Sequence, residues 1–129
     1  HNVNMAFHDG SLQALRQSLD YPEIFPIEKA INRLTKMPAE WLGLDAGSIE
    51  EGCRADICVI DPKKLHSELT EEPIEDYHPN LKGAFRYVKR SDGVVNHVFV
   101  SGEEVFNDSK GFADGLGKTK YGQLLRSMN

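Results

Sequence analysis

The sequence is poor in cysteine and has no long apolar run. Its two cysteines, Cys53 and Cys58, are too few for a disulfide framework, and their spacing differs from the C-x2-C pair that is usual in a zinc site. We expect two free thiols, with Cys58 packed as a small hydrophobic residue. No apolar run approaches the roughly 18 residues of a membrane span, and the first residues lack the charged-then-apolar order of a signal peptide.

Clustered positive charge is also scarce. The formal net charge is -5, and no group of lysines and arginines is denser than the one at residues 86–90. This argues against nucleic acid as a partner, because binding to phosphates needs a basic patch. Together with the lack of an apolar span, it predicts a soluble, cytoplasmic protein with neither a membrane nor a nucleic acid partner.

The length and composition predict one folded domain. The chain has 129 residues, of which 40% are hydrophobic and 27% are charged. These values are typical of globular proteins rather than disordered ones. A chain of this length can bury a core of its own.

Residues 1–45 carry helical periodicity. Apolar residues recur at helical spacing over 12–19 and again over 27–34. A third, short helix is expected over 38–42, and Gly43 can end it in the left-handed conformation.

From residue 47 onward the apolar period falls toward 2, which is typical of strands. The expected strands are 48–50, 55–61, 85–88, 94–100 and 103–106. The strand at 55–61 has a mostly apolar body, so we expect it to be buried on both faces.

The remaining segments are turns, a loop and a last helix. Residues 63–83 are polar and rich in proline and acidic residues, which predicts an irregular surface segment. A D-G turn at 91–93 would join 85–88 and 94–100 into a hairpin. A terminal helix is expected over 120–128.

The most specific motif covers residues 34–62. It contains T-x-x-P-A-x-x-L-G-L from Thr35, then G-x-I-x-x-G from Gly47, then A-D-x-x-V-x-D from Ala55. This order resembles the C-terminal signature of the amidohydrolase superfamily. In that superfamily the segment joins the end of a (β/α)8 metal-hydrolase barrel to a small β-sandwich.

Looser motifs are similar to one branch of that superfamily, the D-aminoacylase-like N-acyl-D-amino-acid deacylases. Residues 88–102 resemble its N-R-S-D-G-V-V stretch, and residues 116–126 resemble its G-x-x-x-x-G-x-x-L-R ending. Residues 4–7 match the N-M-A-F that follows the branch's S-D-A-G-A-H motif, which carries a catalytic aspartate. On that alignment His1 matches the last residue of the motif; alternatively, it is left over from an affinity tag.

The resemblance implies an α+β fold in two parts. Residues 1–45 would be the helical end of the barrel, and residues 46–129 would be a β-sandwich-like domain with a terminal helix. A barrel takes about 250 residues, so this chain resembles only the C-terminal portion of such an enzyme.

The resemblance also implies the partners of the chain. The parent protein would use zinc, or a similar divalent metal, to hydrolyse N-acyl amino acids, and this chain would bind no cofactor. The missing N-terminal portion would add strands to the sandwich. Without it, an unpaired sheet edge would invite association with a second copy, giving a homo-oligomer.

The histidines offer no metal site. His1, His8, His66, His78 and His97 show none of the i, i+2 or i, i+4 spacings of zinc ligands, and the superfamily's H-x-H pair has no match. His8 and Asp9 are the nearest approach to a ligand cluster. A loop histidine followed by a helix cap is the simpler interpretation, and His97 fits a surface or cross-strand position.

Other chemistry-bearing residues also have structural interpretations. Asp56 and Asp61 open and close one strand, and we expect both to accept hydrogen bonds from turn amides. The acidic run at 68–76 lacks the spacing of a calcium loop and reads as a solvated loop. Trp41, the single tryptophan, is expected to be a core anchor at the junction between barrel and sandwich.

The sequence therefore predicts no catalytic, cofactor-binding or metal-binding residue in this chain. It predicts the inactive C-terminal part of a metal-dependent amidohydrolase acting on C–N amide bonds. Two alternatives stay open. One is a stand-alone β-rich module for binding or oligomerisation. The other is the tail of a dihydroorotase- or hydantoinase-like cyclic amidohydrolase.

Overall fold

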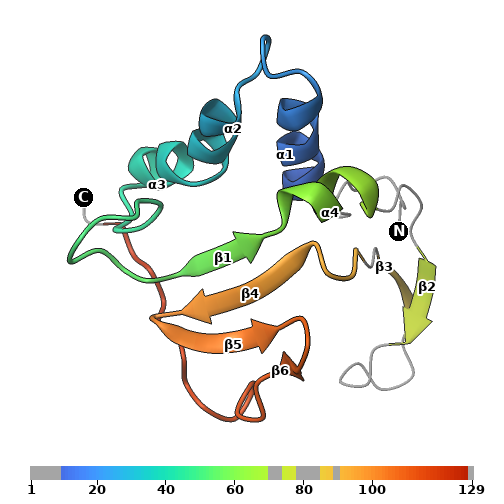
Figure 1. Ribbon diagram of the computed structural model, residues 1–129. Coiled ribbons are helices and arrows are strands. Elements are labelled where there is room, and N and C mark those ends of the chain that lie inside the picture. The colour runs from blue at the N-terminus through green and yellow to red at the C-terminus, as the bar shows by residue number, and fades with distance from the viewer. Residues whose placement is uncertain (1–9, 70–73, 78–84, 89–90, 128–129) are drawn as a thin grey trace.

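A computed structural model describes residues 10–69, 74–77, 85–88 and 91–127 of the chain. In this part, helices lie along one side of a four-stranded antiparallel sheet, and a separate two-stranded ribbon stands at one end (Figure 1). The arrangement is compatible with the α+β class that the sequence predicts.

The first helices follow the predicted apolar stripes. They are α1 (Gly10–Asp20), α2 (Ile27–Leu34) and α3 (Lys36–Leu42). Glu28 lies in the first turn of α2 and Arg33 in its last turn, where each charge is favourable to the helix dipole. Gly43 ends α3 with φ 64° and ψ 38°, the left-handed conformation predicted for it.

An aspartate–proline pair ends one element and begins the next. Strand β1 (Ile57–Ile60) stops before Asp61, whose carboxylate accepts hydrogen bonds from the backbone N–H groups of Lys63 and Lys64. Asp61 thereby caps α4 (Pro62–Ser67), and Pro62 suits the first turn because its missing N–H would have no partner there.

The prediction of an irregular segment over 63–83 is therefore wrong in two places. It contains most of α4 and also strand β2 (Ile74–Tyr77). The polar composition of the segment gave no sign of α4, because the residue that caps this helix is polar and Leu65 is its buried residue.

The four-stranded sheet has the order β1-β4-β5-β6. Strands β4 (Val95–Val100) and β5 (Glu103–Asn107) form a hairpin, and β6 (Gly111–Phe112) extends it. Ser101 and Gly102 join the hairpin with φ 53° and 84°, as a two-residue turn matching the twist of the strands requires. The Asp56 carboxylate accepts a hydrogen bond from the Ser101 N–H at 2.7 Å, so residues ahead of β1 hold this turn.

Strand β3 (Phe85–Val88) pairs with β2 and not with β4, so the predicted hairpin through 91–93 is wrong. The reason is that β4 pairs with β1 along one side and with β5 along the other. Both hydrogen-bonding edges of β4 are thus occupied, which leaves β3 to form a separate ribbon with β2 (Figure 1).

Two further elements differ from the prediction. Residues 48–50 form no strand, and residues 120–127 form no helix. The terminal segment instead runs against the rest of the domain, where the Gln123 amide contacts the Arg54 guanidinium and Gly122 approaches Val100. Contacts with distant residues replace the local hydrogen bonds that a helix would have made.

The core lies where the helices meet one end of the sheet. Its buried members are Leu15, Ala30, Leu65, Leu69 and Val94. The body of β1 is not buried on both faces as predicted, because Val59 is 40% exposed and Cys58 is also exposed in this chain.

We predict that Gly47→Ala destabilises the domain by roughly 3 kcal/mol. Gly47 has φ 83°, and a Cβ there would lie 2.7 Å from the carbonyl carbon and oxygen of Thr35. Gly52 is the matched control, since it has φ 86° with nothing within 4 Å of the added Cβ, so its alanine variant should cost about 1 kcal/mol for backbone strain alone. Urea unfolding of both variants measures the difference. Equal losses would contradict a close contact between Gly47 and α3.

Candidate functional site

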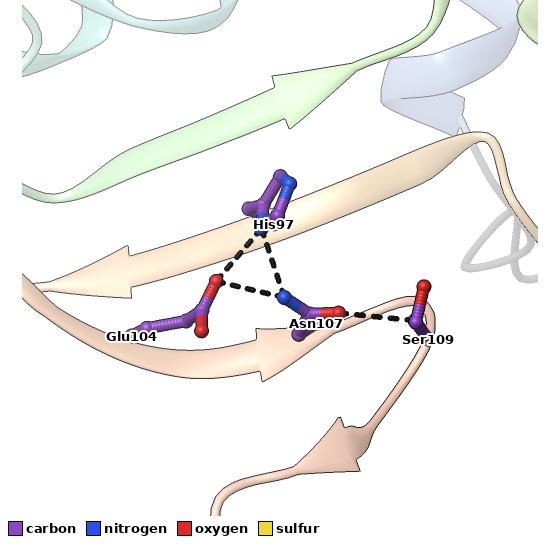
Figure 2. Close-up of polar contacts among 4 residues, drawn as sticks. All are labelled: His97, Glu104, Asn107 and Ser109. Atoms are coloured by element: carbon purple, nitrogen blue, oxygen red, sulfur yellow. Dashed lines mark hydrogen bonds and ion pairs between the residues drawn. The ribbon is translucent and has the colours of Figure 1, made fainter.

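A polar cluster on one face of the hairpin is the strongest candidate site in the described residues. The Glu104 carboxylate accepts hydrogen bonds from His97 Nδ1 at 2.7 Å and from Asn107 Nδ2 at 3.1 Å (Figure 2). The side-chain oxygen Oδ1 of Asn107 in turn accepts a hydrogen bond from the Ser109 backbone N–H at 3.0 Å, which connects the cluster to the turn after β5.

A bulge in β5 brings these side chains together. His97 is opposite Asn107 in the register, but the pairing then shifts so that Phe99 is opposite Glu104. Without the shift, Glu104 and Asn107 would point to opposite faces, because they lie three positions apart and side chains alternate along a strand. The extra residue in β5 turns Glu104 onto the face that carries His97.

The electrostatics of the cluster follow from these contacts. The hydrogen bond from His97 is the main cause that lowers the pKa of Glu104 below its ordinary value, and the bond from Asn107 adds to it. The positive charge of Lys110 acts in the same direction. The carboxylate is therefore held in its charged form and serves as a hydrogen-bond acceptor.

A shallow hollow of about 270 Å³ adjoins the cluster. It is lined by residues 104–107 and 110–114, which include the tilted aromatic pair Phe106 and Phe112. Glu104 and Asn107, which are hydrogen-bonded to each other, form part of its lining.

The described residues do not fit a metal centre. No group of three His, Cys, Asp or Glu side chains in this part of the chain could hold a metal ion. Histidine and carboxylate meet only in pairs in the interactions found here, namely His97 with Glu104 and His66 with Asp20 at 2.9 Å. Catalytic zinc sites usually take three protein ligands, so these pairs fall short of one.

The two aspartates have the structural roles that the sequence predicts. Asp56 accepts from the Ser101 amide and Asp61 from the first amides of α4. His97 is a cross-strand residue, as expected. His1, His8 and Asp9 lie outside the described residues, as do parts of the acidic run 68–76.

Trp41 and Cys58 differ from their predictions. Trp41 is 82% exposed in this chain, so the domain does not bury it as a core anchor. Both cysteines are free, as predicted, and both are exposed. Partial burial of the Cys58 thiol nevertheless raises its pKa, because it disfavours the charged thiolate.

Comparison with known proteins identifies the family. The amidohydrolase family matches residues 2–105, which is most of the chain. This chain belongs to the amidohydrolase family. An uncharacterized protein of Mycobacterium tuberculosis and one of Mycobacterium bovis are each 37% identical to it over 98% of the chain. The 5'-deoxyadenosine deaminase of Methanococcus aeolicus is 33% identical over 69% of the chain.

This amidohydrolase chain spans about a fifth of the curated relatives that it matches: 22% of each mycobacterial protein and 18% of the deaminase. No solved structure matches it. None of the helices described here has the length and apolar content that crossing a membrane requires.

We predict that Glu104→Gln weakens the acid dependence of stability. Because the folded-state pKa of Glu104 is lowered, its contribution is present above the ordinary value of 4.5 and is lost as pH falls through the lowered pKa. Urea midpoints measured from neutral to acid pH should fall less steeply for the variant than for the wild type. Glu103→Gln is the control for removal of one charge from β5, and an identical pH profile for both variants would contradict the prediction.

Capping of α4 gives a second test at the aspartates. Asp61→Ala should destabilise the domain by about 1 kcal/mol, because it removes the acceptor for two backbone amides. Asp61→Asn should recover most of this loss, since asparagine caps helices about as well as aspartate. If both variants are equally unstable in thermal unfolding, the negative charge matters more than the cap.

Proposed function

We propose that this chain is the C-terminal portion of a metal-dependent amidohydrolase whose whole protein hydrolyses the amide bond of N-acyl-D-amino acids. The observation that supports a longer whole protein is the pair of coverages in the comparison. The mycobacterial relatives match 98% of this chain, yet the chain spans only 22% of either protein. The family match at 2–105 supports hydrolysis of a C–N bond as the chemistry.

Amide hydrolysis requires particular chemical groups in the whole protein. Water attacks the carbonyl carbon, the C–N bond breaks, and a carboxylic acid and a free amine result. A divalent metal would activate the water, and a carboxylate would carry the proton to the leaving amine. The described residues hold no suitable metal ligands, so we expect the first ligands to come from elsewhere in the protein and this chain to serve as scaffold.

The choice of N-acyl-D-amino acids rests on the motifs at 88–102 and 116–126. In the structure, the first motif includes the turn that begins β4, and the second includes the segment that contacts Arg54. The described residues of both motifs hold structural positions, so the motifs support the proposal through kinship with the D-aminoacylase-like branch.

Deamination is the second candidate, favoured by the similarity to the 5'-deoxyadenosine deaminase. Both reactions use water to break a C–N bond, but the deaminase reaction releases ammonia from a ring-bound amine. The deaminase matches only 69% of the chain, whereas the mycobacterial proteins match 98% of it. The names of the mycobacterial proteins indicate no deamination, so the match that covers more of the chain does not support it.

The test uses the full-length gene product and this chain in parallel. The full-length protein should contain a divalent metal and should hydrolyse N-acetyl-D-amino acids faster than their L enantiomers. Release of ammonia from 5'-deoxyadenosine, without amide hydrolysis, would favour the second candidate.

We predict that the purified chain supplied with zinc hydrolyses neither substrate class, because the described part lacks a set of metal ligands. Amide hydrolysis by the chain at a rate near that of the full-length protein would overturn its assignment as a scaffold. A native product with the 14.5 kDa mass of this chain would overturn its assignment as part of a longer enzyme.

A further inference from the structure

Residues 120–127, which we call the C-terminal strap, contact the domain through Arg54. The side-chain oxygen of Gln123 accepts hydrogen bonds from both terminal nitrogens of the Arg54 guanidinium, and it lies 3.0 Å from Nη1. The opposite orientation of the amide would place its NH2 group against these donors. The strap forms neither a helix nor a strand, so its contacts with the domain fix its position.

The strap also packs on the β4–β5 hairpin. A Cβ added to Gly122 would lie 3.1 Å from Cγ1 of Val100, the last residue of β4. The C-terminal segment passes the turn between β4 and β5 on its way to the end of the chain (Figure 1). The closed strap therefore covers part of one end of the sheet.

Arg54 is incompletely satisfied in this arrangement. Its side chain is only 14% exposed, and its Nε atom is buried without a hydrogen-bond partner. Oδ2 of Asp56 lies 3.8 Å from this Nε, which is within ion-pair distance but too far for a hydrogen bond. A buried donor without an acceptor costs free energy, so the closed strap leaves Arg54 in a costly state.

Two acceptors therefore compete for one guanidinium. Hydrogen bonds from arginine to a carboxylate are roughly twice as strong as neutral ones and are often bidentate, yet here the neutral amide of Gln123 takes the terminal nitrogens. Asp56 is already held in place, because its carboxylate accepts a hydrogen bond from the Ser101 N–H at 2.7 Å. A rotation of the Arg54 side chain toward Asp56 would satisfy Nε and release Gln123.

We propose that the C-terminal strap is a two-state closure that Arg54 controls. In the closed state Arg54 binds Gln123 and the strap lies on Val100. In the open state Arg54 pairs with Asp56 and the strap leaves the end of the hairpin. The inference concerns contacts within this chain, so it does not depend on the proposed function or on the substrate.

Limited proteolysis with trypsin at neutral pH measures the opening. Lys120 is the first residue of the strap, and Lys63 in α4 reports unfolding of the rest of the domain. Mass spectrometry separates the two products. When opening and closing are fast relative to cleavage, the cleavage rate follows the population of the open state. We expect cleavage after Lys120 to precede cleavage after Lys63.

Substitutions in the strap test the closed state. Gln123→Ala should raise the rate of cleavage after Lys120 about tenfold, because it removes hydrogen bonds to a charged group. Gln123→Glu should lower that rate, since a carboxylate binds the guanidinium more strongly than an amide does. Leu124→Ala is the matched control, because Leu124 is the next residue and is 79% exposed, so it should keep the wild-type rate.

The decisive variant is Asp56→Asn. It removes the competing carboxylate while keeping an oxygen that can accept from the Ser101 N–H, so we expect slower cleavage after Lys120 and a nearly unchanged rate after Lys63. If Asp56 only supports the closed state, the same variant accelerates cleavage after Lys120, and this outcome overturns the exchange of partners.

Two further outcomes overturn the proposal. One is equal rates of cleavage after Lys120 and Lys63 in the wild type, because the strap then opens only when the whole domain unfolds. The other is a wild-type rate for Gln123→Ala, because the bond to Arg54 then does not hold the strap closed. The thermal midpoint of each variant shows whether the domain itself remains folded.

Discussion

Val94 joins the helices of this protein to its sheet, and the other elements are arranged around it. Its side chain is fully buried beside Leu15, Ala30 and Leu65, while its carbonyl oxygen accepts a hydrogen bond from Asp61 N–H at 2.9 Å. The preceding residue, Gly93, donates its N–H to the Asp108 carboxylate at 3.0 Å. One short turn thereby connects the start of α4, the first strand residue of β4 and the loop after β5. Removing any of these contacts would leave a buried polar group without a partner.

The position of β4 inside the sheet determines how the remaining strands pair. With β1 on one side and β5 on the other, β4 has no edge for β3, so β2 and β3 pair with each other. The bulge opposite Val98 and Phe99 then selects which β5 side chains face His97. The polar cluster of His97, Glu104 and Asn107 is a product of this local register and stabilises the hairpin that carries it.

The structure agrees with membership of the amidohydrolase family, and the polar side chains described in it have structural roles. Its carboxylates cap turns and a helix, and its described histidines pair with single acids. The conspicuous surface is apolar, on α2 and α3, and not a cluster of reactive groups.

The sequence by itself determined the features that rest on neighbouring residues. The stripes of α1 and α2, the end of α3 at Gly43 and the turn at Ser101 and Gly102 all follow from local spacing and backbone freedom. The motif at 34–62 was sufficient to indicate the family. Tertiary structure alone decided the partner of β3, the non-helical course of 120–127, the bulge that gathers the polar cluster and the exposure of Trp41. Each of these depends on contacts between residues far apart in the chain, whose competition for hydrogen bonds and buried area local patterns do not record.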